Sequence, residues 1–206
     1  MTQYQGLDVL EIDADGSFAR LDDHARGIEG IGADTGRREV DDVAGETGLV
    51  REYAWTGLGL ADVAELKAFM DARRGRAIPF WLPSTLEDLT LNGDHLAAHL
   101  FIDIPTIGYA SNLFPYTGAR RHLFFRPIAG GASVYRKVIN AMNNLIGTES
   151  LFLEAALGVD MPKSGWIVGF LRCCRLEDDE LSINWRSRGY QTARIRVREL
   201  PLEAPL

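Results

Sequence analysis

The sequence predicts a mainly β fold (α+β) in which one helix packs against a sheet. Segments of strand length and strand composition recur along most of the chain, separated by clusters of turn-forming residues. Only residues 60–74 have the period of an amphipathic helix. Apolar residues make up 46% of the 206-residue chain, which is enough to enclose a substantial core. We therefore expect a single domain, 1–206, built as a β-sandwich or barrel that the helix closes on one side.

The predicted helix runs directly into an aromatic strand. Its apolar positions recur at steps of three and four residues, and Gly75 follows its basic end, where a helix commonly stops. Residues 77–82 then have the composition of a buried strand. Because Phe80 and Trp81 are adjacent, they should lie on opposite faces of that strand. The core residues expected here are Leu66, Phe69, Met70, Phe80 and Trp81.

Other strands are expected from alternation and composition. These segments are 7–12, 38–43, 49–55, 88–92, 120–127, 134–142, 151–157, 166–176 and 181–186. In the last of them Ile183 and Trp185 alternate with polar residues, which predicts that both are buried. The acidic run 177–180 is expected to be a hairpin turn, and Asn92–Gly93 is a second hairpin signal. Residues 25–36 are expected to form a glycine-rich loop, and about 93–118 an irregular excursion.

The segment near the C-terminus has two different faces when it is placed on a strand. Arg194, Arg196 and Arg198 share one face, and Ala193, Ile195 and Val197 share the other. This alternation predicts a half-buried strand. The arginine face is then available to solvent or to another subunit, so these three arginines are candidate subunit contacts.

The charge distribution restricts the class of partner. Residues 1–100 carry a formal balance of −10, and residues 101–206 carry +3. An acidic first half does not favour sequence-specific nucleic-acid binding, because phosphate contacts need clustered Lys and Arg. No apolar run is long enough to span a bilayer, and the start of the chain has no secretory signal pattern. We therefore expect synthesis in the cytoplasm and no membrane anchor.

Motifs for catalysis or for cofactor binding are missing from the sequence. There is no nucleophile elbow, no zinc-protease helix, no phosphate loop and no paired-cysteine motif. His95 and His99 are four residues apart and could share a helix face, but no third ligand follows at metal-site spacing. Cys173 and Cys174 are adjacent, so one should be buried in the core and the other less so. We expect no enzyme activity, no cofactor and no metal.

Two segments resemble a known family. Residues 66–91, LKAFMDARRGRAIPFWLPSTLEDLTL, and residues 175–201, RLEDDELSINWRSRGYQTARIRVRELP, are similar to distal tail (minor tail-tip) proteins of long-tailed bacteriophages and related gene transfer agents. The resemblance implies a tail-tube-like fold and a structural virion component of the baseplate. It implies a homohexameric ring in the virion tail that joins the tail tube protein to the tip hub proteins. The negative balance of the first half would suit a lumen through which DNA slides.

A second function class stays open. A β-sandwich that binds carbohydrate or cell wall could use aromatic side chains as sugar platforms, and the candidates are Trp55, Tyr109, Tyr116 and Trp185. The oligomeric state separates the two classes, since a tail-tip subunit forms rings and a wall-binding module is retained on polysaccharide.

Overall fold

The protein is mainly β with one packed helix, as the sequence predicts. The computed structural model describes residues 2–12, 14, 22–25, 28–32, 38–42, 48–84, 86–115, 118–144, 146–187, 190–200 and 204–205. The first strands are β1 (Gln3–Tyr4), β2 (Leu7–Asp8), β3 (Asp22–Ala25), β4 (Ile28–Gly32), β5 (Arg38–Asp42) and β6 (Gly48–Leu58). The helix α1 (Leu60–Arg73), the short turn η1 (Gly75–Ala77) and β7 (Phe80–Pro83) follow. The next elements are β8 (Phe101–Pro105), the π-helical turn η2 (Tyr109–Leu113) and the short turn η3 (Gly118–Arg120). The last strands are β9 (His122–Pro127), β10 (Val134–Asn143), β11 (Thr148–Leu153), β12 (Trp166–Leu176), β13 (Ser182–Ser187) and β14 (Tyr190–Glu199).

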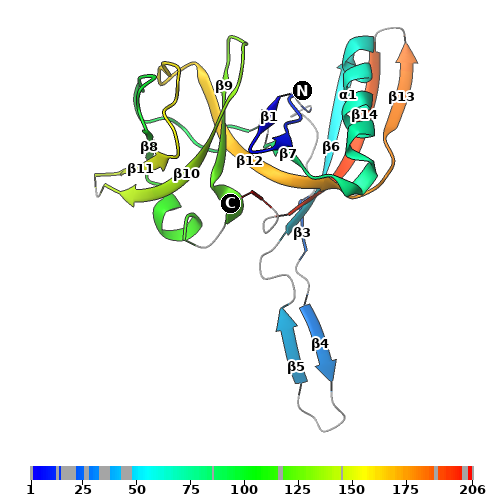
Figure 1. The fold of residues 1–206 in the computed structure, drawn as a ribbon, viewed down its shortest axis with the longest axis horizontal. Coiled ribbons are helices and arrows are strands. Elements are labelled where there is room, and N and C mark those ends of the chain that lie inside the picture. The colour runs from blue at the N-terminus through cyan, green and yellow to red at the C-terminus, as the bar shows by residue number, and fades with distance from the viewer. Residues whose placement is uncertain are drawn as a thin grey trace.

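One large antiparallel sheet runs through two lobes of the molecule (Figure 1). Its strand order is β3-β6-β14-β12-β9-β10-β11-β8, with β13 paired to β14 and β7 paired to β12. We call α1, β3, β6, β13 and β14 the helix lobe, and β8, β9, β10, β11 and η2 the strand lobe. The described strands form an open sheet, so the sandwich-like alternative of the sequence prediction fits and the barrel does not.

Strand β12 belongs to both lobes. Val168 near its start pairs with Phe125 of β9 and forms a bridge with Leu89 on its other edge. Cys174 near its end pairs with Glu199 of β14 and, on the other edge, with Phe80 of β7. On one edge of β12, β9 of the strand lobe therefore pairs with the first half and β14 of the helix lobe with the second half. On the other edge, β12 pairs with β7 and with Leu89.

Helix α1 covers one face of the helix lobe. At its start the Asp62 carboxylate accepts a 2.9 Å hydrogen bond from the Gly59 N–H, which satisfies a backbone donor that the helix leaves unpaired. Its buried face packs into one apolar cluster with β6, β7 and β14. At its end Arg74 takes the left-handed conformation at φ 51°, one residue before the expected Gly75, which is also left-handed at φ 65°.

Phe80 and Trp81 point to opposite faces of β7, as the sequence predicts. The Phe80 ring packs edge-on against Phe69 of α1 at 5.2 Å between centroids. Trp81 lies instead in a central cluster between the lobes, where its indole Nε1 donates to the Tyr4 carbonyl at 2.9 Å. The strand after the helix thus contributes to two separate parts of the core. A third apolar cluster fills the strand lobe.

Two expected irregular regions contain regular structure. Within residues 93–118, which were expected to be irregular, Phe101–Pro105 forms β8 and pairs with β11. Within residues 25–36, which were expected to be a loop, Ile28–Gly32 forms β4. In both cases the pairing partner is a later segment of the chain, and local composition does not reveal such a partner.

Strands β4 and β5 form an arm that extends away from the two lobes (Figure 1). They pair antiparallel with each other from Ile28↔Asp42 to Gly32↔Arg38. Strand β3 lies at the base of the arm, where it pairs with β6 and so joins the large sheet. Residues 43–47, between β5 and β6, lie outside the described residues.

Two turn predictions and the extent of one predicted strand are wrong. Asp88–Asn92 forms only a single bridge, at Leu89, and Asn92–Gly93 does not join two paired strands. The acidic run 177–180 does not reverse the chain, because β12 and β13 both pair with β14, Leu176 opposite Val197 and Ser182 opposite Arg194. The run is an outward bulge between two strands that follow the same edge of β14. The alternation expected over 151–157 holds as a strand only to Leu153.

Among the described residues, no helix combines the length and the apolar character needed to cross a membrane.

Candidate functional site

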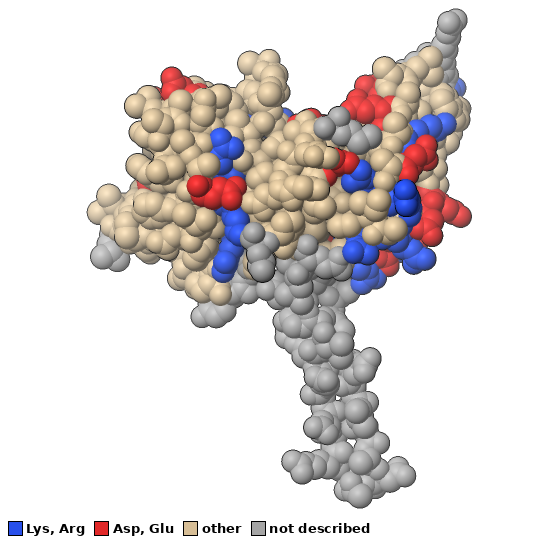
Figure 2. Space-filling model, viewed as in Figure 1, with Lys and Arg blue, Asp and Glu red and all other residues tan. Residues whose placement is uncertain are grey.

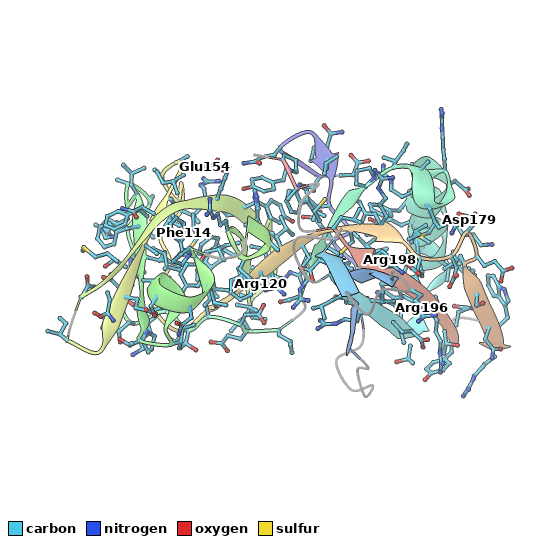
Figure 3. The ribbon with its side chains drawn as sticks, turned by 90° about the horizontal axis from the view of Figure 1, so that it is seen from below. Phe114, Arg120, Glu154, Asp179, Arg196 and Arg198 are labelled. Atoms are coloured by element: carbon cyan, nitrogen blue, oxygen red, sulfur yellow. The ribbon has the colours of Figure 1, made fainter. Side chains whose placement is uncertain are left out.

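The most prominent surface feature of the helix lobe is the face of β14 that α1 does not cover. Arg194, Arg196 and Arg198 are exposed on it, while Ala193, Ile195 and Val197 between them are buried against the helix side. This is the alternation that the sequence predicts. We call the exposed side the arginine face. In Figure 3 Arg196 and Arg198 lie on the side of the sheet that is turned away from the helix.

Arg194 and Arg198 form ion pairs with carboxylates of β6 and of the segment after β12. Arg194 lies 3.2 Å from Glu52 of β6, and both side chains are more than half exposed. Arg198 donates two hydrogen bonds, of 2.6 and 2.7 Å, to the two carboxylate oxygens of Glu177. This hydrogen bonding lowers the pKa of Glu177 and raises that of Arg198. Exposed pairs of this kind contribute only about 0–1 kcal/mol each, so they position the arginines more than they stabilise the fold.

The expected core residues are mostly found in the core, with one clear exception. Leu66, Phe80 and Trp81 have no exposed surface, and Phe69 and Met70 are also buried. Ile183 is half-buried and packs against the edge of the helix-lobe cluster.

Trp185 was expected in the core but is 54% exposed. It does point to the α1 side of the sheet, since it pairs with buried Gln191. At that place on β13 the helix offers the Lys67 ammonium group, 5.7 Å from the ring centroid, rather than an apolar surface. The alternation of apolar and polar residues therefore predicts correctly which face of β13 carries Trp185, but the prediction that this side chain is buried is wrong.

His95 and His99 are neighbours, and each ring accepts a hydrogen bond from a backbone N–H. Their ring centroids are 5.7 Å apart in an irregular segment instead of on a helix. His95 Nε2 accepts a hydrogen bond from the Asp103 N–H at 3.3 Å, and His99 Nδ1 accepts one from the Leu96 N–H at 3.2 Å. The part of the chain that the structure describes contains no group of three residues that could hold a metal ion.

Cys173 and Cys174 are both buried, which corrects the expectation that one is less buried than the other. Cys174 lies in the helix-lobe cluster and Cys173 in the central cluster, so β12 is covered on both faces. Both are thiols without a disulfide, and burial raises the pKa of Cys174 well above its usual value. A protonated, enclosed thiol is a poor nucleophile and a poor metal ligand.

Sequence reasoning missed a buried ion-pair network between the lobes. Arg120, just before β9, donates to Glu199 of β14 at 2.6 Å, and Arg172 of β12 lies 3.6 Å from the other oxygen of that carboxylate. Arg172 and Glu199 are both buried. The guanidinium of Arg120 also stacks 5.6 Å from the ring centroid of Phe170. No sequence motif marks such a network, because Arg120 and Arg172 lie 79 and 27 positions before Glu199 in the sequence.

A second polar cluster, formed by buried Tyr4 and His122 with exposed Glu154, joins the N-terminal strands to the strand lobe. The Tyr4 hydroxyl lies 3.1 Å from His122 Nδ1 and donates to Glu154 at 3.3 Å. Burial is the main cause that lowers the pKa of His122 to about 4. Burial also raises the pKa of Tyr4. Trp81 packs against both rings of this cluster, 5.6 Å from Tyr4 and 4.6 Å from His122 between ring centroids.

The acidic bulge between β12 and β13 closes over the end of α1. Asp179 accepts a 3.0 Å hydrogen bond from the Arg76 N–H. A groove of about 400 Å³ lies beside it, between α1 and β13, with Met70, Leu176 and Ile183 in its lining. Its charged lining residues are Lys67, Asp71, Arg74 and Asp179.

Comparison of the chain with protein-family models gives no match, and comparison with functionally characterised proteins gives none either.

Proposed function

We propose that the protein is a structural subunit of a phage tail tip, a distal tail protein that forms a homohexameric ring between the tail tube and the tip hub. The observation that carries this proposal concerns the two segments with family resemblance, 66–91 and 175–201. They are about 85 positions apart in the sequence, yet they build one unit. The first provides α1 and β7, and the second provides β13, β14 and the end of β12.

The surface of the molecule supports an assembling subunit. The arm extends from the body, the arginine face is an uncovered side of a sheet, and β13 lies at an edge of the helix lobe (Figure 1). A ring of identical subunits needs two different surfaces on each copy that fit one another and close by rotation. A chain with a projecting hairpin and an uncovered sheet face offers two such surfaces.

The charge pattern in Figure 2 agrees with subunit contacts that are concentrated on the helix lobe. Acidic and basic side chains gather over the helix lobe, whereas the visible face of the strand lobe is mainly uncharged apart from a short row. Charged surfaces give specificity and orientation to an interface. The negative first half of the chain also suits a passage for DNA, provided that the arginine face is turned towards a neighbour and not towards the lumen.

The carbohydrate-binding alternative loses two of its platform residues. Trp55 is 1% exposed and donates its Nε1–H to the Ile12 carbonyl, and Tyr109 is fully buried. Neither ring can stack on a sugar. Tyr116 lies outside the described residues, so Trp185 is the exposed ring among the described candidates.

The test is the state of assembly. We expect light scattering of the purified protein to give six times the mass of one chain, and negative-stain microscopy to show rings with a central hole. A protein that stays monomeric over the accessible concentration range and is retained on cell-wall polysaccharide contradicts the proposal. Trp185→Ala provides the control for retention, because it removes the exposed candidate platform.

A further inference from the structure

Strand β13 forms an open margin of the helix lobe (Figure 1). We propose that β13 of one copy pairs antiparallel with β13 of a second copy, about a two-fold axis at Asn184. The Trp185 ring of each copy then lies beside the groove between α1 and β13 of the other. This contact goes beyond the proposed function, because the contacts that close a ring join two different surfaces, whereas a two-fold contact joins the same surface on both copies.

The free edge of β13 is the first observation. Arg194 of β14 pairs with Ser182 of β13 on one side and with Ala54 of β6 on the other, so β13 is the outer strand at this end of the sheet. Among the described strands, β14 is the only partner of β13. Its second edge therefore offers a row of backbone N–H and C=O groups to a further strand.

Strand β13 lacks the features that usually protect such an edge. Proteins commonly place prolines or inward-pointing charges on edge strands. The sequence of β13, SINWRS, contains no proline, and the side chains that point to the α1 side are those of Ile183 and Trp185. Its charged residue, Arg186, alternates with them and lies on the opposite side of the sheet. The edge is therefore competent to pair with another strand.

The groove beside β13 can receive an apolar side chain. It has a volume of about 400 Å³, and its lining includes Met70 of α1 together with Leu181 and Ile183. In the proposed pairing Ile183 stands opposite Trp185 of the second copy, with the two Cβ atoms about 4.5–5.5 Å apart. That tryptophan then covers apolar groove surface, and its own ring, 54% exposed in the single chain, becomes buried.

The register follows from the faces of the strand. In an antiparallel pair, side chains that stand opposite each other point to the same side of the sheet, so an axis must pass through a residue and not between two. An axis at Asn184 pairs Ile183 with Trp185 and Ser182 with Arg186, and it leaves out the irregularity that follows Trp185. The two Asn184 amides can donate to and accept from each other. No like charges stand directly opposite in this register.

A strand of a different protein is the competing occupant of this edge. A second copy is favoured because β13 is complementary to itself: an apolar residue meets an aromatic one, an amide meets an amide, and the arginine meets a serine. One strand pair with a tryptophan on each side is smaller than a standard interface, which buries about 1,200–2,000 Å². The contact should therefore form as the protein concentration rises, and it should double the mass of the assembly that the protein forms.

Disulfide trapping of Asn184→Cys tests the contact. This substitution places two thiols at the axis, where opposite Cα atoms are about 4.5–5.5 Å apart, within the range of about 4.4–6.8 Å that a disulfide spans. Arg186→Cys is the matched control, since it is also exposed on the same side of β13. Its two copies would be four positions apart along the paired strands, or about 14 Å. The native thiols Cys173 and Cys174 are buried.

We expect covalent dimer to form about tenfold faster in Asn184→Cys than in Arg186→Cys, because paired strands hold the thiols at an effective concentration in the mM range. Adding Trp185→Ala to Asn184→Cys should lower this rate to that of the control, since it removes the ring that covers the groove. Adding Tyr190→Ala instead should leave the rate unchanged, because Tyr190 is exposed on β14, one strand away from the joint.

Light scattering over a concentration series separates this inference from the proposed function. A mass that rises from six chains to twelve, with the preferential disulfide, supports both. A mass that rises from one chain to two, with the same disulfide, supports the inference and contradicts the ring. A mass fixed at six chains, with equal disulfide rates in the two variants, overturns the inference and leaves the proposed function standing. Equal rates in a protein that stays monomeric overturn both.

Discussion

The carboxylate of Glu199 and the guanidinium of Arg120 form a 2.6 Å ion pair that connects the two lobes. Glu199 ends β14 in the helix lobe, and Arg120 ends η3, two residues before β9 of the strand lobe. Arg172 of the shared strand β12 lies on the second oxygen of the same carboxylate, at 3.6 Å. The buried Glu199 carboxylate thus connects β14 with Arg120 of η3 and with Arg172 of β12.

Removing this carboxylate should destabilise the protein strongly. Glu199→Gln leaves the buried Arg172 without its opposite charge, and losing one member of a buried pair costs about 3–5 kcal/mol. Urea unfolding measures the change in the free energy of unfolding. Glu177→Gln is the matched control, because its partner Arg198 is 45% exposed, and there we expect a loss of at most about 1 kcal/mol. Equal losses in the two variants contradict the assignment of Glu199 as the connection between the lobes.

The two tryptophans of β7 and β13 should respond differently to truncation. Trp81→Ala removes a fully buried ring from the central cluster and should cost about 3–5 kcal/mol of unfolding free energy. Trp185→Ala should cost far less, since more than half of that ring is already exposed. Thermal and urea unfolding of both variants test this. Unchanged melting of Trp81→Ala disproves the central position of its ring.

The stability of the protein should decrease below neutral pH because of His122. Its pKa is about 4 in the folded protein, below the ordinary value of 6.5, so the unfolded chain binds the proton first as the pH falls. The contribution of neutral His122 is complete above about pH 6.5 and is lost as the pH falls from there towards 4. Replacing it by Gln should flatten this part of the stability curve.

Urea unfolding of wild type and His122→Gln at pH 7.5 and pH 5 checks this expectation. The wild type should lose more stability between these two values than the variant does. From pH 7.5 to 8.5 the two proteins should show the same trend, because the ordinary imidazole is already neutral there. A histidine signal that titrates near 6.5 in the folded protein, assigned by NMR to His122, contradicts the prediction.

Gly75 should not tolerate a side chain. Its φ of +65° is unfavourable for other residues, and a Cβ there would stand 2.3 Å from an oxygen of Asp179. We expect Gly75→Ala to cost about 1–2 kcal/mol from the left-handed backbone alone. Gly93→Ala is the matched control, since nothing lies within 4 Å of a Cβ at that position. Gly75→Ala unfolding at the same urea concentration as wild type contradicts this description of the helix end.

The sequence predicts best where local pattern and tertiary structure agree. The helix begins at Leu60 and β12 runs from Trp166 to Leu176, both as expected. The helix has a clear amphipathic period and a glycine after its end, and β12 is a long apolar run rich in strand-forming residues. Alternation also separated the arginines of β14 from its buried residues. In these segments the pattern is produced by the same burial that stabilises the fold.

Prediction fails where the partner of a segment decides its structure. The arm contains Gly30 and Gly32, so its first strand has the composition of a loop and becomes a strand only by pairing with β5. The acidic run 177–180 has the composition of a turn, yet the chain continues along β14 after it. The Glu199 network could not be predicted, because nothing local to Arg120 indicates a carboxylate 79 positions later.

The sharing of β12 also determines how the molecule responds to a pulling force. Tension that separates the lobes along β12 acts parallel to the strand, so the backbone hydrogen bonds to β9 and β14 are loaded together, in shear, and do not open one after another. Such a geometry resists extension far better than one in which strands peel apart. The protein should therefore resist extension most strongly along the axis of β12, the strand that its two lobes share.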